Sequence, residues 1–245
     1  CNEKIKFAAL LERAIELGLD AVCTGHHATL VDGPDGRELH RASDDAKDQS
    51  YVLGVLTAEQ LAHTYFPLGQ TPSKAIVRAE AAARGLTVAQ KPDSHDICFI
   101  PDGDTRGWLA DKVGTAQGDI VDRTGAVVGS HEGAHAYTVG QRRGLSLGVP
   151  AADGKPRFVL EVRPVSNTVV VGPREALATA EIAGGRFSWA GRAPASDEFA
   201  CHVQIRAHAD PVPARAVLTD AGVTVTPESP FDGVAPGQTA VLYDG

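Results

Sequence analysis

The stretch EKIKFAALLERAIELGLDAVCTG, residues 3–25, decides the fold of the first part of the chain. Apolar residues at positions 5, 7, 10, 11 and 15 follow the period of a helix, and Gly18 ends it. The short apolar run over 19–24 then predicts a buried strand that enters a loop at Gly25. A helix followed at once by a buried strand is typical of an α/β layer.

The residues that follow continue this pattern. A hairpin is predicted over 28–42, with its turn at 33–36, and helices are predicted over 48–56 and 72–84. One more short strand is expected over 87–89. Helices that alternate with short strands indicate an α/β domain for the first hundred residues or so.

The character of the sequence changes after residue 103, where glycine becomes frequent and only 105–112 has a helical pattern. From Arg157 onward, alternating apolar runs separated by turns predict an all-β module, a small barrel. These runs are RFVLEV, TVVVG, FACHVQI, ARAVLT, VTVT and TAVLY. The predicted fold is therefore an α/β domain, a small central domain and a C-terminal β-barrel.

The composition is ordinary for a soluble globular protein, with 43% hydrophobic and 22% charged residues. No apolar run approaches the ~20 residues that cross a membrane, and no signal peptide opens the chain, so we expect a cytoplasmic protein. The chain lacks methionine, which we interpret as the mark of a fragment. The net charge is −8, yet residues 104–163 carry +1, so a local patch there could bind RNA.

Four cysteines are scattered along the chain without a C-x-x-C pair, so neither a disulfide scaffold nor a metal site is predicted. Cys98 lies in KPDSHDICFI beside His95 and Asp96. It could be a small buried apolar side chain, as most free cysteines are, or an exposed thiol whose pKa a nearby imidazolium lowers. The residues alone leave both possibilities open.

The other three cysteines have different surroundings. Cys1 precedes the first predicted helix, where the helix dipole favours an anionic sulfur, although an ordinary cap-region cysteine fits the pattern equally well. Cys23 and Cys201 lie within apolar strands. We predict that both are inert core residues.

Two glycine-containing loops could hold a ligand. The Gly-His-His sequence at 25–27 follows a strand and could approach a phosphate, a base or, less readily, a metal. The loop at 140–144 presents Arg142 and Arg143 between glycines, and guanidinium groups suit phosphate. A loop that is merely solvated is the alternative there.

The stretch Lys47-Asp48-Gln49-Ser50 begins a predicted helix. Asp48 and Ser50 could simply cap that helix. Lys47 and Gln49 could instead reach RNA, because such side chains commonly contact phosphate and sugar.

Taken together, these segments carry a resemblance. CNEKIKF, TGHHA, DDAKDQSYVLG, KPDSHDICFIPDGD, YTVGQRRGLSLG and PGQTAVLYDG occur in this order, and the whole chain closely resembles the tRNA-specific 2-thiouridylase family. The resemblance implies an ATP pyrophosphatase-type α/β domain over 1–103, a central tRNA-binding domain over 104–168 and a C-terminal β-barrel over 169–245. It also implies ATP with Mg²⁺, a tRNA substrate and a sulfur-relay protein that delivers persulfide sulfur.

The resemblance also assigns residues. Cys1 matches the family's nucleophile, Cys98 its persulfide carrier and Gly25 a nucleotide-contacting glycine. The positions that match tRNA contacts are His26, Lys47, Asp48, Gln49, Arg206 and Gln238. Arg206 is followed by Ala207 where the family often has an aromatic residue. The family's SGGVDSS phosphate-binding loop is not found in these residues, so we expect the chain alone not to adenylate RNA.

The chemistry that the resemblance implies begins with adenylation of the wobble uridine, which makes its C2 oxygen a good leaving group. A persulfide on Cys98 supplies the sulfur. Cys1 attacks the inner sulfur and leaves a Cys1–Cys98 disulfide to be reduced.

Three other functions remain to be weighed. A different ATP pyrophosphatase-type enzyme would not need cysteines at both position 1 and position 98. A non-catalytic RNA-binding β-barrel module would tolerate replacement of both. A thiol–disulfide protein is disfavoured because the chain has no C-x-x-C pair.

Overall fold

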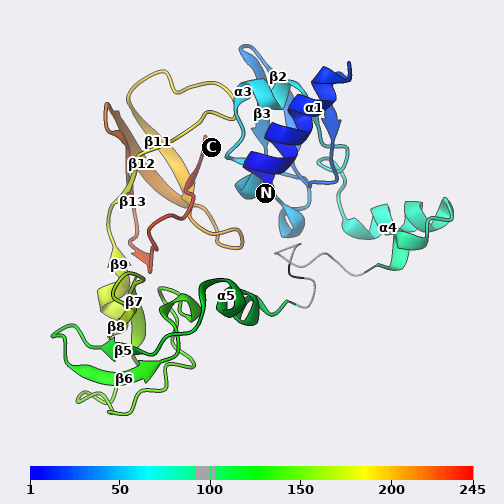
Figure 1. Cartoon of the computed structure of the whole chain (residues 1–245). Helices are drawn as coiled ribbons and strands as arrows, with labels where there is room; N and C mark the ends of the chain where they lie inside the picture. The colour runs from blue at the N-terminus through cyan, green and yellow to red at the C-terminus, as the bar shows by residue number, and fades with distance from the viewer. Residues whose placement is uncertain (92–99, 101–102, 245) are drawn as a thin grey trace. The chain divides into compact units, whose positions relative to one another are not determined.

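The computed structural model describes residues 1–91, 100 and 103–244, which divide into two compact units. Unit 1 contains Cys1–Lys91, Ile182–Glu228 and Thr239–Gly245. Unit 2 contains Pro92–Glu181 and Ser229–Gln238. Each unit therefore combines segments that are far apart in the sequence, as the colours of Figure 1 show.

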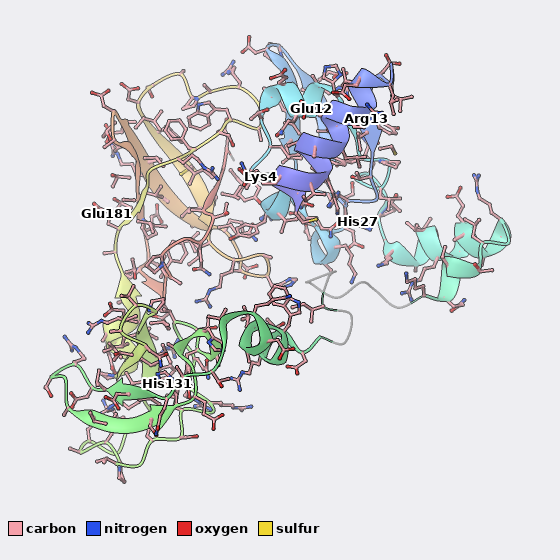
Figure 2. All side chains as sticks on the ribbon, viewed as in Figure 1. Lys4, Glu12, Arg13, His27, His131 and Glu181 are labelled. Atoms are coloured by element: carbon pink, nitrogen blue, oxygen red, sulfur yellow. The ribbon has the colours of Figure 1, made fainter. Side chains whose placement is uncertain are left out.

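Unit 1 opens with one continuous helical segment, the π-helix η1 (Asn2–Ala9) followed by α1 (Leu10–Glu16). This segment confirms the helix predicted over 3–18. Its buried residues are Phe7, Leu11 and Ala14, at helical spacing. Exposed charged side chains of the same segment, labelled in Figure 2, are Lys4, Glu12 and Arg13.

The other elements of the α/β part largely follow the predicted order. Strand β1 (Val22–Cys23) confirms the predicted strand and pairs in parallel with β4 (Thr64–Tyr65). Strands β2 (Thr29–Gly33) and β3 (Gly36–His40) form the predicted hairpin, and α4 (Lys74–Ala83) confirms the second helix. The remaining short elements are η2 (Asp45–Lys47), α2 (Ser50–Leu53), α3 (Ala58–Ala62) and η3 (Thr87–Gln90).

Two local predictions for this part are wrong. The helix expected over 48–56 is only the single turn of α2, because Asp48 has φ −55° and ψ 128° and Gly54 ends the turn. The strand expected over 87–89 is the 3-10 helix η3. Val88 is exposed there and only Ala89 of this run is buried, so the run has no set of alternate buried residues to pack as a strand.

The core of the α/β part lies between the first helical segment, α2 and α3. Its buried side chains are Phe7, Ala28, Leu53, Leu56, Leu61 and Phe66. Full burial of one such large side chain stabilises a fold by about 1.5–3 kcal/mol. Close packing also requires Gly69, since a Cβ there would lie 2.0 Å from the carbonyl oxygen of Ala28.

Unit 1 also contains the C-terminal sheet. Its five antiparallel strands, in spatial order, are β10 (Ile182–Gly184), β13 (Gly222–Pro227), β12 (Val212–Thr219), β11 (Glu198–Gln204) and β15 (Val241–Tyr243). The sheet curls as part of a barrel (Figure 1). In β12 the buried residues Ala214 and Ala216 alternate with exposed ones, as the period-two pattern predicts, whereas β11 and β13 keep this alternation only in part.

Among the described residues of unit 2, the first element is α5 (Thr105–Val113), which confirms the predicted helix. A four-stranded sheet follows, in the order β6 (Val127–His131), β5 (Gly118–Val121), β8 (Thr168–Gly172) and β7 (Phe158–Arg163). The smaller elements are η4 (Ala134–Ala136), η5 (Arg174–Leu177) and the strand pair β9 (Ala178–Thr179) and β14 (Phe231–Asp232).

The all-β module expected from Arg157 onward is divided between the two units. Its first two runs form β7 and β8, which join the central sheet with β5 and β6, two strands that the sequence pattern did not predict. Ile120 of β5 is opposite Val169 of β8, and both are fully buried in one core. Burial of these apolar side chains on one sheet therefore decides the division.

Candidate active site

Cys1 stands at the beginning of η1 with its residue exposed. Its carbonyl oxygen accepts hydrogen bonds from the backbone N–H of Ile5 at 2.9 Å and of Lys6 at 3.2 Å. The backbone of Cys1 is thereby part of the helix while its side chain is accessible. Rare π-helical turns often occur at functional sites, and the positive end of a helix favours an anionic group.

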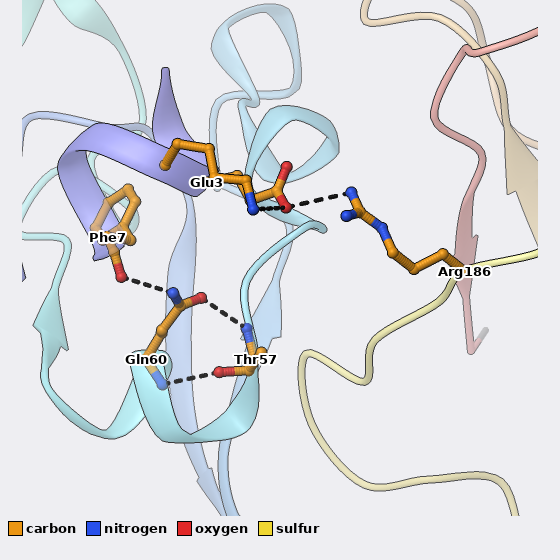
Figure 3. A network of polar contacts seen from close by, with 6 residues as sticks. Glu3, Phe7, Thr57, Gln60 and Arg186 are labelled. Carbon is orange, nitrogen blue, oxygen red and sulfur yellow. Dashed lines mark hydrogen bonds and ion pairs between the residues drawn. The ribbon is translucent and has the colours of Figure 1, made fainter. Parts of the chain in front are cut away.

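Contacts from two other segments hold this helix in place (Figure 3). Gln60 and Thr57 form a capping box at the start of α3, and the Gln60 Nε2 also donates to the Phe7 carbonyl oxygen at 2.6 Å. On the exposed side, Arg186 donates to the Glu3 carboxylate at 3.2 Å. The helix that begins at Cys1 is thus tied to α3 and to the segment between β10 and β11 of the C-terminal sheet.

The other cysteines divide by exposure. Cys201 of β11 is buried, which confirms its predicted place in the core, and burial raises the pKa of its thiol. The same prediction for Cys23 is wrong, because Cys23 is exposed. Val22 takes the buried face of the two-residue strand β1, so its neighbour points the other way. Cys98, with His95 and Asp96, lies outside the described residues.

His26 is buried rather than displayed on a loop, with 7% of its surface exposed. Its ring lies between those of Phe7 and Phe66, with centroids 5.8 and 5.9 Å away. Its Nδ1 is 2.7 Å from the Thr24 hydroxyl, and its Nε2 is 3.5 Å from the Lys6 amine. Burial, then the charge of Lys6, lowers the pKa of His26 to about 4, so the ring is neutral at physiological pH.

Gly25 is exposed at the carboxyl end of β1, in a parallel strand pair. Ligands of α/β sheets bind outside the carboxyl ends of their strands. A Cβ added at Gly25 would meet only the Leu68 side chain, at an ordinary 3.9 Å. The chain's own packing therefore does not require glycine here. A nucleotide approaching this backbone fits both the topology and the open surface.

The stretch 47–49 is anchored by its second and third residues. Asp48 accepts hydrogen bonds from the backbone N–H of Ala42 at 2.9 Å and from the Ser50 hydroxyl at 2.7 Å. Gln49 and His27 exchange two bonds: the Gln49 N–H donates to the His27 carbonyl oxygen, and the Gln49 Oε1 accepts from the His27 N–H. Lys47 is exposed at the end of η2. The stretch therefore presents a cation on a fixed backbone.

The arginine loop of unit 2 is held at its first half. Gly140 donates its N–H to the Val159 carbonyl oxygen, and Val159 donates back to the Gln141 carbonyl oxygen, so the loop is fastened to β7. Arg142 and Arg143 are both exposed. Neither guanidinium has an ion pair or hydrogen-bond partner within the described part of the chain.

Arg206 and Gln238 occupy turns rather than strands. Arg206 is exposed two positions after the end of β11, and its carbonyl oxygen accepts from the Gln204 side chain at 2.9 Å. Gln238 closes a turn with Ala235, whose N–H donates to the Gln238 Oε1 at 3.1 Å. Gly237 has φ 84° in that turn, a conformation that suits glycine.

Sequence reasoning did not single out Lys6, Thr24 or Tyr51, although each contacts a predicted site residue or its neighbour. For Lys6 and Thr24 the available signal was a polar residue in or beside an otherwise apolar run, whereas Tyr51 follows polar residues and carried no such signal. Within the described residues, no three His, Cys, Asp or Glu side chains gather as a metal-binding group. In the same part of the chain, no helix has the length and apolar character needed to cross a membrane.

Three family models match successive parts of the chain. Residues 1–102 match the tRNA methyl transferase HUP domain, 106–173 the tRNA methyl transferase PRC-barrel domain, and 179–245 the aminomethyltransferase beta-barrel domain. These matches confirm the predicted order of an α/β domain, a central domain and a C-terminal β-barrel.

Curated relatives match the whole chain. A tRNA-specific 2-thiouridylase MnmA of Leifsonia xyli subsp. xyli is 73% identical over all of this chain and 68% of its own length. Proteins with the same name from Clavibacter sepedonicus and Paenarthrobacter aurescens are 68% and 66% identical, again over all of this chain and over 64% and 68% of their own lengths. The chain thus spans about two thirds of these relatives. It belongs to the tRNA-specific 2-thiouridylase family, a family of tRNA-uridine sulfurtransferases.

Proposed function

We propose that the protein converts the wobble uridine of tRNA into 2-thiouridine, by adenylation of the uracil C2 oxygen and transfer of a persulfide sulfur. The observation that carries the proposal is the 73% identity of the whole chain to a tRNA-specific 2-thiouridylase. The exposed Cys1 at the start of a firmly held helix supports it. The activity is proposed for the full-length protein that contains this chain.

ATP, with Mg²⁺, supplies the adenylyl group that turns the C2 oxygen into part of a good leaving group, AMP. We assign the backbone at Gly25 to the nucleotide, because it is exposed at the carboxyl end of β1. The wobble base must leave the anticodon stack to reach this site, which is how proteins commonly recognise loop bases.

The sulfur steps use two cysteines of this chain. A sulfur-relay protein gives the outer sulfur of its persulfide to the Cys98 thiol, which becomes Cys98–S–SH while the donor keeps a thiol. The Cys1 thiolate attacks the inner sulfur, forming a Cys1–Cys98 disulfide and releasing hydrosulfide. Hydrosulfide attacks C2, and AMP departs with the original oxygen. A thiol reductant then restores both cysteines.

Binding of tRNA is assigned to exposed groups on both units. The proposed contacts with tRNA are Lys47, Arg142, Arg143, Arg206 and Gln238. Phosphate contacts are commonly made by such basic and amide side chains. Asp48, Gln49 and His26 already bond within the protein, so we propose that they shape the tRNA-contacting surface.

The cysteine assignments are tested in the full-length protein with three serine variants. Cys98→Ser should abolish thiolation and leave tRNA binding nearly intact, because it removes one sulfur and no phosphate contact. Cys1→Ser should also stop turnover, yet the Cys98 peptide should then retain one extra sulfur after loading, as mass spectrometry can show. Cys23→Ser is the matched control for Cys1→Ser, since Cys23 is also an exposed cysteine of unit 1.

The alternatives give different results. Full thiolation by Cys98→Ser, or the extra sulfur on Cys23, would refute the cysteine assignment. A non-catalytic RNA-binding module would bind tRNA without releasing pyrophosphate from ATP, whichever cysteine is present. A different ATP pyrophosphatase-type enzyme would release pyrophosphate but place no sulfur on tRNA.

A further inference from the structure

One phenol group of unit 1 touches the backbone beside two of the proposed tRNA contacts. Tyr51 lies in α2, directly after the stretch 47–49. Its hydroxyl is 3.0 Å from the Ile205 carbonyl oxygen and 2.7 Å from the Thr239 carbonyl oxygen. Ile205 immediately precedes Arg206 in the sequence, and Thr239 immediately follows Gln238.

The turn that carries Arg206 is also held from within. Gln204 is only 4% exposed, and its Nε2 donates to the carbonyl oxygens of Arg206 at 2.9 Å and Ala207 at 3.3 Å. Its Oε1 accepts from the Arg41 guanidinium at 3.1 Å. The buried Gln204 amide therefore connects the turn, through its Nε2, to Arg41 of the α/β part, through its Oε1.

The connection continues to the stretch 47–49 through the last strand. The Arg41 guanidinium lies over the Tyr243 ring, 4.6 Å from its centroid. The Tyr243 hydroxyl is 3.0 Å from the Ser50 hydroxyl, which itself donates to Asp48. Because the single Ser50 hydrogen goes to Asp48, the Tyr243 hydroxyl is the donor to Ser50.

These contacts fix relative positions because they are directional. Apolar side chains could slide across one another, but the single Tyr51 hydroxyl hydrogen is shared between two carbonyl oxygens, and a shift of either backbone weakens the contact with it. Burial, with Tyr243 nearby, raises the pKa of Tyr51, so its hydroxyl keeps the proton that it donates. Both anchored backbones are next to side chains that bear the proposed tRNA contacts.

We propose that Tyr51 is a positioning residue for tRNA binding, which holds the Arg206 turn and the backbone after Gln238 at a fixed place relative to the stretch 47–49. The inference rests on the proposed function, because it assumes that Arg206 contacts tRNA. Tyr51 itself need not touch the RNA. Its hydroxyl sets where the cation is presented.

The test compares Tyr51→Phe with Tyr65→Phe in the full-length protein. Tyr51→Phe should weaken binding of unmodified tRNA by about three- to ten-fold, the usual range for one lost hydrogen bond. Loading of sulfur on Cys98 should be unchanged. Tyr65 of β4 is 58% exposed, and its hydroxyl has no hydrogen-bond partner in the described part of the chain, so Tyr65→Phe should bind as the wild type does.

A double-mutant cycle separates positioning from mere stability. If Tyr51 acts through Arg206, the loss caused by Arg206→Ala should be smaller in the Tyr51→Phe background, by about three-fold or more. The dependence of binding on salt should also become shallower in Tyr51→Phe, by up to about one unit of slope, since one cation is no longer well placed. A purely structural role would lower the melting temperature and leave the two effects additive.

Each result has a defined meaning. Additive effects of Tyr51→Phe and Arg206→Ala, or wild-type binding by Tyr51→Phe, would overturn the inference alone. Wild-type binding by Arg206→Ala would overturn the proposed tRNA contact, and the inference with it. If Tyr51→Phe does not fold, Arg41→Gln replaces it, because Arg41 is exposed and its loss frees Gln204 from the same connection. Additivity of Arg41→Gln with Arg206→Ala would then refute the inference.

Discussion

Acidification should destabilise unit 1 through the buried imidazole of His26. The pKa of His26 is lowered from 6.5 to about 4, chiefly by burial and next by the charge of Lys6. Between pH 6.5 and pH 4, His26 is therefore mostly protonated in the unfolded chain and mostly neutral in the folded chain. The stability of the folded state is full above about pH 6.5 and falls as the pH approaches 4.

The magnitude follows from these two pKa values. Between about pH 7.5 and about pH 5 an unfolded histidine takes up nearly one proton, whereas His26 takes up almost none. Integration of that difference gives about 2 kcal/mol, and solvent screening reduces it to about 1–2 kcal/mol. A protonated His26 would also place a second cation 3.5 Å from the Lys6 amine, with two phenylalanine rings around it.

Urea unfolding at the two pH values measures this contribution. Trp108→Phe leaves Trp189 as the only tryptophan, so that fluorescence reports on unit 1. From about pH 7.5 to about pH 5, the free energy of unfolding of the Trp108→Phe variant should fall by about 1–2 kcal/mol more than that of the Trp108→Phe, His26→Gln double variant. His208→Gln removes an exposed histidine of the same unit and serves as the control. An identical pH dependence with and without His26 would refute the reasoning.

Two further changes test the proposed contacts. Gly25→Ala should leave the melting temperature unchanged, because the added Cβ meets only Leu68, at 3.9 Å. The same change should weaken binding of ATP to the full-length protein, and wild-type ATP affinity would remove Gly25 from the nucleotide site. Replacement of both Arg142 and Arg143 by alanine should reduce the slope of log affinity for tRNA against log salt concentration by about one to two units. Arg84→Ala removes an exposed arginine that is paired with Glu80 and should leave the slope unchanged. An unchanged slope in the double variant would mean that the loop is merely solvated.

Segments with a strong period were predictable from the sequence. The first helix follows from buried residues such as Phe7 and Leu11 on one face, and the hairpin follows from the glycine- and proline-containing turn at 33–36. Both depend on contacts within a short stretch of chain. Such local patterns are readable without knowing what packs against them.

The strands β5 and β6 were not predictable for the opposite reason. Each contains a glycine, and in β5 only Ile120 is fully buried. Their membership of the central sheet depends on β8, which is far along the sequence and pairs with β5 through Ile120 and Val169. Pairing with a strand so far along the sequence does not require an alternating apolar pattern within β5 or β6, so their sequences contained no strand signal.

The burial of His26 shows the same limit at the candidate site. Two adjacent histidines after a glycine suggest a polar, accessible loop. Phe7 and Phe66 nevertheless close around the first of them, and Thr24 and Lys6 face its two ring nitrogens. The sequence could indicate that position 26 matters, but whether it meets ligand or core depends on residues that only the fold brings there.

Exposure alone does not identify the reactive cysteine, because Cys1 and Cys23 are both exposed. Their backbone settings differ. Cys23 lies in a strand that pairs with β4, whereas Cys1 is the N-cap residue at the start of a helix. Aligned peptide dipoles stabilise an anion at that end by about 0.3–1 kcal/mol, and a strand offers no such field. A thiolate is the nucleophile in sulfur transfer. The chain can therefore expose two thiols and still favour the one at Cys1, so a thiol-specific alkylating reagent used at limiting concentration should label Cys1 faster than Cys23.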